Sequence, residues 1–141
     1  MIDQSVGDVM TQPIRTIPAE TTACEVATLF AEHEIGSVVV VSESGESLGI
    51  VTETDIMQQV AAGADMSAVH AETMMSTPLI TITSTEDIHT AAALMKDNSI
   101  RRLPVLDDGE LIGNLTTTDL THYLPRLLNR IVRERTDRGE D

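Results

Sequence analysis

The amino-acid sequence predicts an α/β protein made of two tandem repeats, each in the order strand, helix, strand, strand, helix. Three observations support this prediction. The segment 9–14 (VMTQPI) recurs 65 positions later as 74–79 (MMSTPL), and matched apolar positions continue through both copies. Apolar residues at helical spacing follow each copy. A run of four valines at 38–41 is typical of a strand that is buried on both faces.

Each repeat opens with a short strand and a helix. The strands are expected at Ile14–Ile17 and Leu79–Ile82, because the proline before each one disfavours helical geometry in the residue that precedes it. The first helix is expected over Thr22–His33, where Thr22 and Glu25 fit a capping box. The apolar faces of the two helices match: Ala23, Val26, Ala27 and Phe30 in the first, and Ile88, Ala91, Ala92 and Met95 in the second.

A hairpin and a second helix complete each repeat. The hairpins are expected where apolar runs flank a glycine: Ser37–Val41 and Leu48–Val51 around Gly45, then Leu103–Leu106 and Leu111–Leu115 around Gly109. The second helices should start near Thr54 and Thr118. The pattern therefore predicts one domain at 6–62, another at 70–124, and a C-terminal helical tail at 125–141.

Composition limits the classes of function. The net charge is −14 and the only basic density lies in the C-terminal tail, so binding to nucleic acid is not expected. The single cysteine cannot form an internal disulfide, and neither a signal peptide nor a membrane span is evident, so we expect a cytoplasmic protein without membrane contact. The acidic, lysine-poor composition resembles that of proteins from salt-accumulating (halophilic) microbes, although an ordinary acidic bacterial protein is the alternative.

Three kinds of landmark recur in order in both repeats. They are the leading segment Asp8–Thr11, the segments 35–41 (IGSVVVV) and 100–105 (IRRLPV), and two Gly-h-h-Thr-x-x-Asp elements, where h is apolar, at 49–55 and 113–119. Asn114 departs from the pattern by taking one h position. Over residues 6–124 the chain resembles the tandem cystathionine-β-synthase (CBS) domain pair, also called a Bateman module.

The resemblance implies two βαββα repeats packed about a pseudo-two-fold axis. It also implies a regulatory module, not an enzyme, with no required cofactor. Members of the family typically bind adenosine-containing ligands, such as AMP, ADP, ATP, S-adenosylmethionine and sometimes NAD, in clefts between the halves. They commonly form homodimers in which four CBS domains make a flat disc.

The two Thr-x-x-Asp elements are the first candidates for ligand binding. An ionised carboxylate only accepts hydrogen bonds, so it suits the two hydroxyl groups of a ribose. Exposed N–H groups at a helix start favour anions. By resemblance, Asp55 and Asp119 would bind ribose, with Thr52 and Thr116 nearer the phosphates. The alternative is that each element is only a capping box.

Basic and apolar residues complete the candidate site. Arg101 and Arg102 stand where the first repeat has Gly36 and Ser37. By resemblance they would contact phosphate, and the alternative is pairing with nearby acids such as Asp107 and Asp108. Four isoleucines could line an adenine slot, although core packing is the alternative for them: Ile14, Ile35, Ile80 and Ile100.

Other side chains give weaker signals. The four histidines lack metal-ligand spacing, no catalytic motif is present, and Cys24 is expected to be a small buried residue on its helix. The tail at 125–141 has an apolar side and a basic side. We expect it to pack on this chain or on a dimer partner, and the alternative is docking of an effector protein. A ligand-free structural module that acts through dimerisation and this tail is the second functional hypothesis.

Overall fold

The computed structural model describes residues 4–11 and 14–123, which divide into two compact units. Residues Ile14–Ile80 form the first unit, and the second combines residues 4–11 with residues 81–123. Each unit therefore contains the body of one repeat and the segment that leads the other repeat. We call these segments, residues 4–11 and 71–76, the leaders. The predicted helical tail at 125–141 lies outside the described residues.

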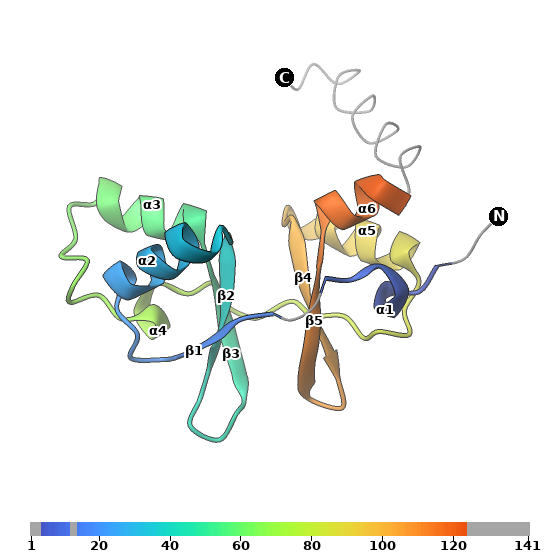
Figure 1. The fold of residues 1–141 in the computed structure, drawn as a ribbon, viewed down its shortest axis with the longest axis horizontal. Coiled ribbons are helices and arrows are strands. Elements are labelled where there is room, and N and C mark those ends of the chain that lie inside the picture. The colour runs from blue at the N-terminus through green and yellow to red at the C-terminus, as the bar shows by residue number, and fades with distance from the viewer. Residues whose placement is uncertain (1–3, 12–13, 124–141) are drawn as a thin grey trace, which may run out of the picture. The chain divides into compact units, whose positions relative to one another are not determined.

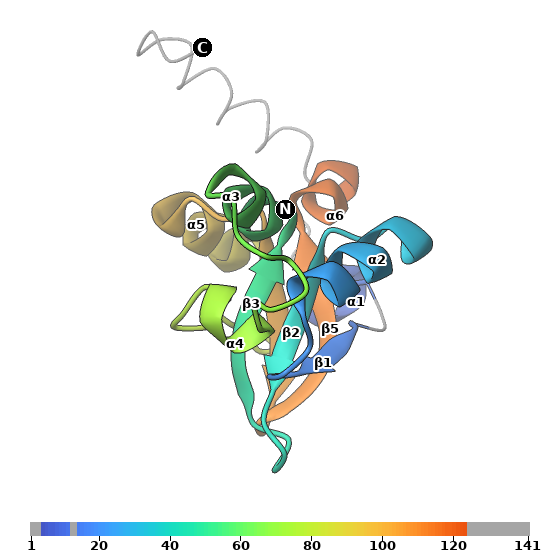
Figure 2. The same cartoon turned by 90° about the vertical axis from the view of Figure 1, so that its left-hand side faces the viewer.

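The first unit contains a three-stranded sheet of β1 (Thr16–Pro18), β2 (Ser37–Val41) and β3 (Ser47–Thr52). The strand order is β1-β2-β3, with β1 parallel to β2 and β3 antiparallel to it. Three helices accompany the sheet: α2 (Ala23–His33), α3 (Glu53–Ala61) and α4 (Ala71–Met74). Figure 2 shows the short helix α4 beside β3, although nearly twenty residues of chain separate the two.

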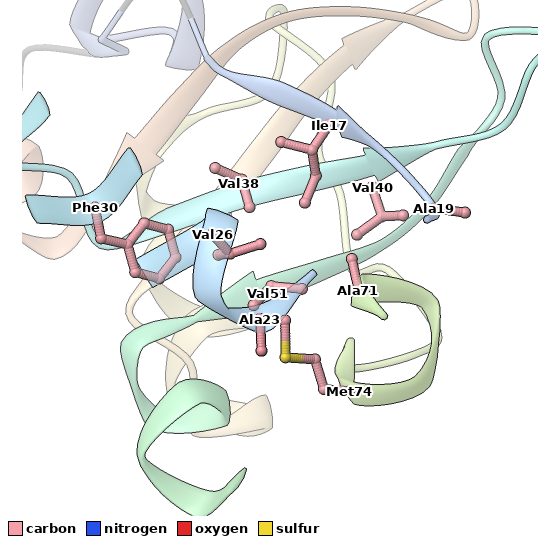
Figure 3. Packing of buried hydrophobic residues seen from close by; sticks show 10 residues of the cluster. All are labelled: Ile17, Ala19, Ala23, Val26, Phe30, Val38, Val40, Val51, Ala71 and Met74. Atoms are coloured by element: carbon pink, nitrogen blue, oxygen red, sulfur yellow. The ribbon is translucent and has the colours of Figure 1, made fainter. Parts of the chain in front are cut away.

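The core of the first unit lies between its sheet and its helices. Figure 3 shows Val38 and Val40 of β2 pointing toward Ala23, Val26 and Phe30 of α2. Ala71 and Met74 of the leader helix α4 join the same cluster. Three of the four valines at 38–41 are fully buried, which confirms the prediction of a buried strand. A leader thus supplies part of the core.

The second unit is built from α1 (Val6–Val9), α5 (Ile88–Asn98), β4 (Arg102–Asp107), β5 (Glu110–Thr116) and α6 (Thr117–Tyr123). Figure 1 shows the leader helix α1, in dark blue, among the yellow and orange elements of this unit. The hairpin of β4 and β5 and the apolar face of α5 lie where the sequence predicts them.

The prediction of a strand at Leu79–Ile82 is wrong. Within this segment only Ile82 pairs, in a single parallel bridge to Val105. In the first repeat the amide of Val39 donates to the carbonyl of Arg15 at 3.0 Å. Pro104 takes the place of Val39 in the second repeat, and a proline has no N–H to donate. The loss of this bond shortens the pairing.

Each leader pairs with the last strand of the unit that it enters. Thr11 and Asn114 of β5 exchange two backbone hydrogen bonds of 2.7 and 2.9 Å. In the first unit the amide of Ser76 donates to the carbonyl of Ile50 of β3 at 2.8 Å. The sequence did not predict α1 and α4, because four residues are too few to show helical periodicity.

Helix α2 confirms one prediction and corrects another. The amide of Glu25 donates to Thr22 Oγ1 at 3.2 Å and the amide of Thr22 donates to Glu25 Oε1 at 3.1 Å, so the predicted capping box is present. Cys24, predicted to be buried, is exposed. It follows Ala23 by one position, which places it about 100° around the helix from the buried face.

Candidate functional site

Both Thr-x-x-Asp elements cap the helices that follow them. In the first unit the amide of Thr52 donates to Asp55 Oδ2 at 2.8 Å, at the start of α3. In the second unit the amide of Thr116 donates to Asp119 Oδ2 at 2.9 Å, and the amide of Asp119 donates to Thr116 Oγ1 at 3.1 Å. The capping-box interpretation therefore holds for both copies.

The other carboxylate oxygen of each aspartate contacts a leader. Ser76 Oγ donates to Asp55 Oδ1 at 3.3 Å, and Thr11 Oγ1 donates to Asp119 Oδ1 at 3.0 Å. Ser76 and Thr11 are 65 positions apart, so the contact is the same in both units. Each aspartate thus connects the start of a helix to an exchanged leader. Sequence reasoning missed this partner, although the repeated Thr/Ser of the leading motif was its signal.

The glycine of each Gly-h-h-Thr-x-x-Asp element makes room for the same leader. A Cβ atom on Gly49 would lie 2.8 Å from Met75 Sδ and 2.9 Å from the carbonyl oxygen of Ser76. A Cβ atom on Gly113 would lie 2.6 Å from Met10 Sδ. A side chain at Gly49 would therefore press on the backbone of the leader, and one at Gly113 would require the Met10 side chain to move.

The two aspartates differ in exposure. Asp55 is 9% exposed, and its carboxylate accepts three hydrogen bonds, from the amide and hydroxyl of Thr52 and from the hydroxyl of Ser76. Asp119 is only half-buried. Because a carboxylate has about four acceptor positions, Asp119 retains the greater capacity to accept hydrogen bonds from a ligand.

The backbone of two arginines adjoins the helix start that carries the more open aspartate. Arg102 pairs with Thr116 across the hairpin of the second unit, and the carbonyl of Arg101 accepts from the amide of Thr117 at 2.9 Å. Arg101 is exposed and Arg102 is half-buried. The backbone of Arg101 and Arg102 therefore lies beside the start of α6, which carries Thr116 and Asp119, whereas the sequence left open which site the arginines would serve.

The first unit has the same backbone arrangement without the cations. Ser37 pairs with Thr52 across its hairpin, and the amide of Glu53 donates to the carbonyl of Gly36 at 3.2 Å. Gly36 and Ser37 hold the positions of the two arginines. A phosphate group would therefore find a basic partner from this part of the hairpin only in the second unit.

Asp107, one of the acids considered as an arginine partner, bonds to Ser84. The Ser84 amide donates to Asp107 Oδ1 at 2.9 Å, and its hydroxyl donates to Oδ2. The side-chain and backbone hydrogen bonds from Ser84 hold the pKa of Asp107 below its usual value.

The four candidate isoleucines divide between the units. Ile14, Ile35 and Ile80 lie in the first unit, and only Ile100 lies in the second, directly before Arg101. All four are half-buried. Ile35 packs against the core of the first unit, as the core-packing alternative predicts.

The described residues contain neither a metal cluster nor a membrane-spanning helix. Among residues 4–11 and 14–123, no group of three histidine, cysteine or acidic side chains lies together as a metal ion would require. Within the same ranges, no helix combines the length and the apolar character needed to cross a bilayer.

The chain is similar to several known proteins. The CBS domain model matches residues 6–62 and 71–126. An uncharacterized protein of Methanopyrus kandleri is 41% identical over 132 residues, which cover 92% of this chain and 67% of that protein. A CBS domain protein of Pyrobaculum aerophilum, solved in complex with AMP, matches with a TM-score of 0.80 and 30% identity, over 89% of this chain and 96% of that one.

The CBS domain pair of the protein MJ0100 was solved with 5′-methylthioadenosine and S-adenosyl-L-methionine. It matches with a TM-score of 0.80 and 26% identity, over 88% of this chain and 98% of that one. Sequence motif, fold and these similarities agree, and the chain belongs to the CBS domain family, of which it carries two domains in tandem.

Proposed function

We propose that this protein is a regulatory module, not an enzyme, that binds an adenosine-containing ligand. The observation that carries the proposal is the grouping of Arg101, Arg102, Thr116 and Asp119 at the start of α6. It draws support from two similar structures, one bound to AMP and the other to S-adenosyl-L-methionine. The regulatory output would follow if the free and bound arrangements differ in their affinity for the ligand.

The chemistry of the second unit favours a ligand with both ribose and phosphate. Asp119 would accept hydrogen bonds from the ribose hydroxyls, since its carboxylate is half-buried and has spare acceptor positions. Arg101 would pair with the phosphate, for which a planar guanidinium is well suited. AMP, ADP and ATP carry both groups, whereas S-adenosylmethionine carries no phosphate.

Calorimetric titration with AMP and with adenosine, in molar KCl, tests this proposal. Replacing Arg101 by Gln should weaken AMP binding roughly tenfold, equivalent to about 1.4 kcal/mol, and leave adenosine binding unchanged. Asp119→Asn should weaken the binding of both AMP and adenosine. Asp55→Asn, the matched change in the unit without cations, should leave the affinity for AMP in the second unit unaltered.

A second candidate function is a ligand-free structural or protein-docking module. The observation that favours it is that both aspartates already bond to a helix cap and to a leader hydroxyl. On this account neither AMP, ADP, ATP, S-adenosylmethionine nor NAD raises the melting temperature. A ligand at 100 times its dissociation constant would add about 2.7 kcal/mol, so a flat response would exclude the sensor.

Assembly into a homodimer is part of the first proposal and also of the second. Light scattering on the full chain, with and without AMP, measures it directly. A mass that changes with AMP would connect ligand binding to assembly, and a constant monomer mass would remove dimerisation from both proposals.

A further inference from the structure

The carboxylate of Asp119 is held at both of its oxygens by two parts of the second unit that are far apart in sequence. The amide of Thr116 donates to Oδ2 at 2.9 Å, and the hydroxyl of Thr11, 108 positions away, donates to Oδ1 at 3.0 Å. Because hydrogen bonds are directional, rotation of the carboxylate about its Cβ–Cγ bond would strain both of them. The two donors therefore fix the plane of the carboxylate as well as its position.

The Thr11 hydroxyl is presented by a backbone that is itself fixed. The amide of Thr11 donates to the carbonyl of Asn114 at 2.7 Å, and its carbonyl accepts from the amide of Asn114 at 2.9 Å. Residues that are directly opposed in an antiparallel bridge point to the same face, and Thr116 lies two positions after Asn114. The leader thus places its hydroxyl on the face of β5 that carries Thr116.

The acceptor positions that remain on Asp119 match a vicinal diol. A carboxylate has about four acceptor positions, two on each oxygen. Within the described residues, Thr116 and Thr11 occupy one position on each oxygen, which leaves about one on each. A ribose has two neighbouring hydroxyl groups and can donate one hydrogen bond to each oxygen.

Asp55, the equivalent residue of the first unit, lacks this arrangement. Its Oδ2 accepts from both the amide and the hydroxyl of Thr52, at 2.8 and 3.2 Å, and its Oδ1 accepts from the Ser76 hydroxyl at 3.3 Å. The two positions on Oδ2 are therefore occupied, and a diol cannot bond to both oxygens while the cap is intact. The comparison associates recognition of a diol with the second unit.

We propose that the hydroxyl of Thr11 positions Asp119 and thereby determines the preference of the second unit for ribose over deoxyribose. The inference rests on the proposed function, because it requires a ribose to meet Asp119. Without the hydroxyl the carboxylate would be free to turn, and the entropy lost on fixing it would then oppose ligand binding. Thr11 is a positioning residue, which acts through Asp119 and not by contact with the ligand.

Calorimetric titration of the full chain with AMP and with 2′-deoxy-AMP, in molar KCl, tests this inference. The wild type should bind AMP roughly tenfold more tightly, the effect of one hydrogen bond to a charged group. Thr11→Val replaces the hydroxyl by a methyl group and should reduce this preference to about threefold or less. Thr11→Ser keeps the hydroxyl and should retain the preference.

Two features of the design separate positioning from folding. Thr11 is exposed, and substitutions at exposed positions change stability little, so both variants remain folded. Ser76→Ala is the matched control, because it removes the equivalent hydroxyl from Asp55 in the first unit. It should leave the preference for AMP over 2′-deoxy-AMP unchanged.

Three results would overturn the inference while the proposed function stands. Unchanged affinities in Thr11→Val would show that the helix cap alone positions Asp119. An equal loss of affinity for AMP and 2′-deoxy-AMP would show that the hydroxyl supports the unit without affecting the recognition of ribose. Tighter binding of AMP by Thr11→Val would show that the leader competes with the ribose. Failure of the wild type to bind either nucleotide would overturn the proposed function and this inference together.

Discussion

Replacing Gly49 or Gly113, the glycines that face the leaders, by alanine should lower the free energy of unfolding for a different reason in each unit. In Gly49→Ala the new methyl group would lie 2.9 Å from the backbone oxygen of Ser76 and 2.8 Å from Met75 Sδ. The backbone there is fixed by the 2.8 Å hydrogen bond from Ser76 to Ile50. Overpacking of this kind costs about 1–3 kcal/mol, and the loss of glycine entropy in the unfolded chain offsets about 0.4–1 kcal/mol. We expect a net loss of about 1–2 kcal/mol.

The overlap in Gly113→Ala is mainly with a side chain. The new methyl group would lie 2.6 Å from Met10 Sδ but 3.1 Å from the backbone oxygen of Thr11. Truncating the methionine should therefore relieve most of the strain. We expect Gly113→Ala and Met10→Ala to couple favourably by about 1 kcal/mol, because interacting neighbours couple by 0.5–3 kcal/mol. Gly49→Ala should gain much less from Met75→Ala, because the backbone clash persists.

Urea unfolding of the single and double variants measures both couplings. The changes in unfolding free energy caused by two distant, independent substitutions add to within about 0.3–0.5 kcal/mol, which sets the threshold for detecting a coupling. Strict additivity for Gly113→Ala with Met10→Ala would refute the view that this glycine exists to admit the leader. Equal rescue in both units would refute the distinction between side-chain and backbone overlap.

Three further predictions concern the surface. The Ser84 hydrogen bonds lower the pKa of Asp107 in the folded state, so its stabilising contribution is present above about pH 4 and lost as the pH falls through the lower folded value; Asp107→Asn should flatten this acid limb in unfolding experiments. Cys24 should react with Ellman's reagent in the folded protein about as fast as in urea, and strong protection would contradict its exposure. The melting temperature should rise from about 0.1 to about 2 M KCl as salt screens the excess of acids, and a flat response would show that repulsion among the acids does not limit stability.

Local patterns were sufficient to predict the hairpins and the long helices. Strand β2 occupies the predicted Ser37–Val41, and the capping box of α2 is formed by the predicted pair, Thr22 and Glu25. These features depend on neighbouring residues, so a sequence motif contains the information. The prediction of a strand at Leu79–Ile82 failed because Pro104, which is far away in the chain, stands in the neighbouring strand and has no N–H to pair with this segment.

The exchange of leaders had no local signal. The repeat showed that Thr11 and Ser76 are equivalent, but not which aspartate each would contact. That choice depends on pairing between segments more than twenty residues apart, which a periodicity cannot reveal. The sequence named Arg101 and Asp119 as candidates but left open which site the arginines would serve; the backbone pairing of the hairpin places the arginines next to the start of the helix that carries Asp119.

The exchanged leaders have a consequence for what happens when the chain is cut. A single break near Gly63 would separate the repeats in sequence, yet the N-terminal fragment would still hold residues 4–11, which complete the second unit. The C-terminal fragment would hold α4 and Ser76, which complete the first. Each fragment would need the other to bury its own core. Proteolysis between the repeats should therefore leave a noncovalent complex that migrates as one particle.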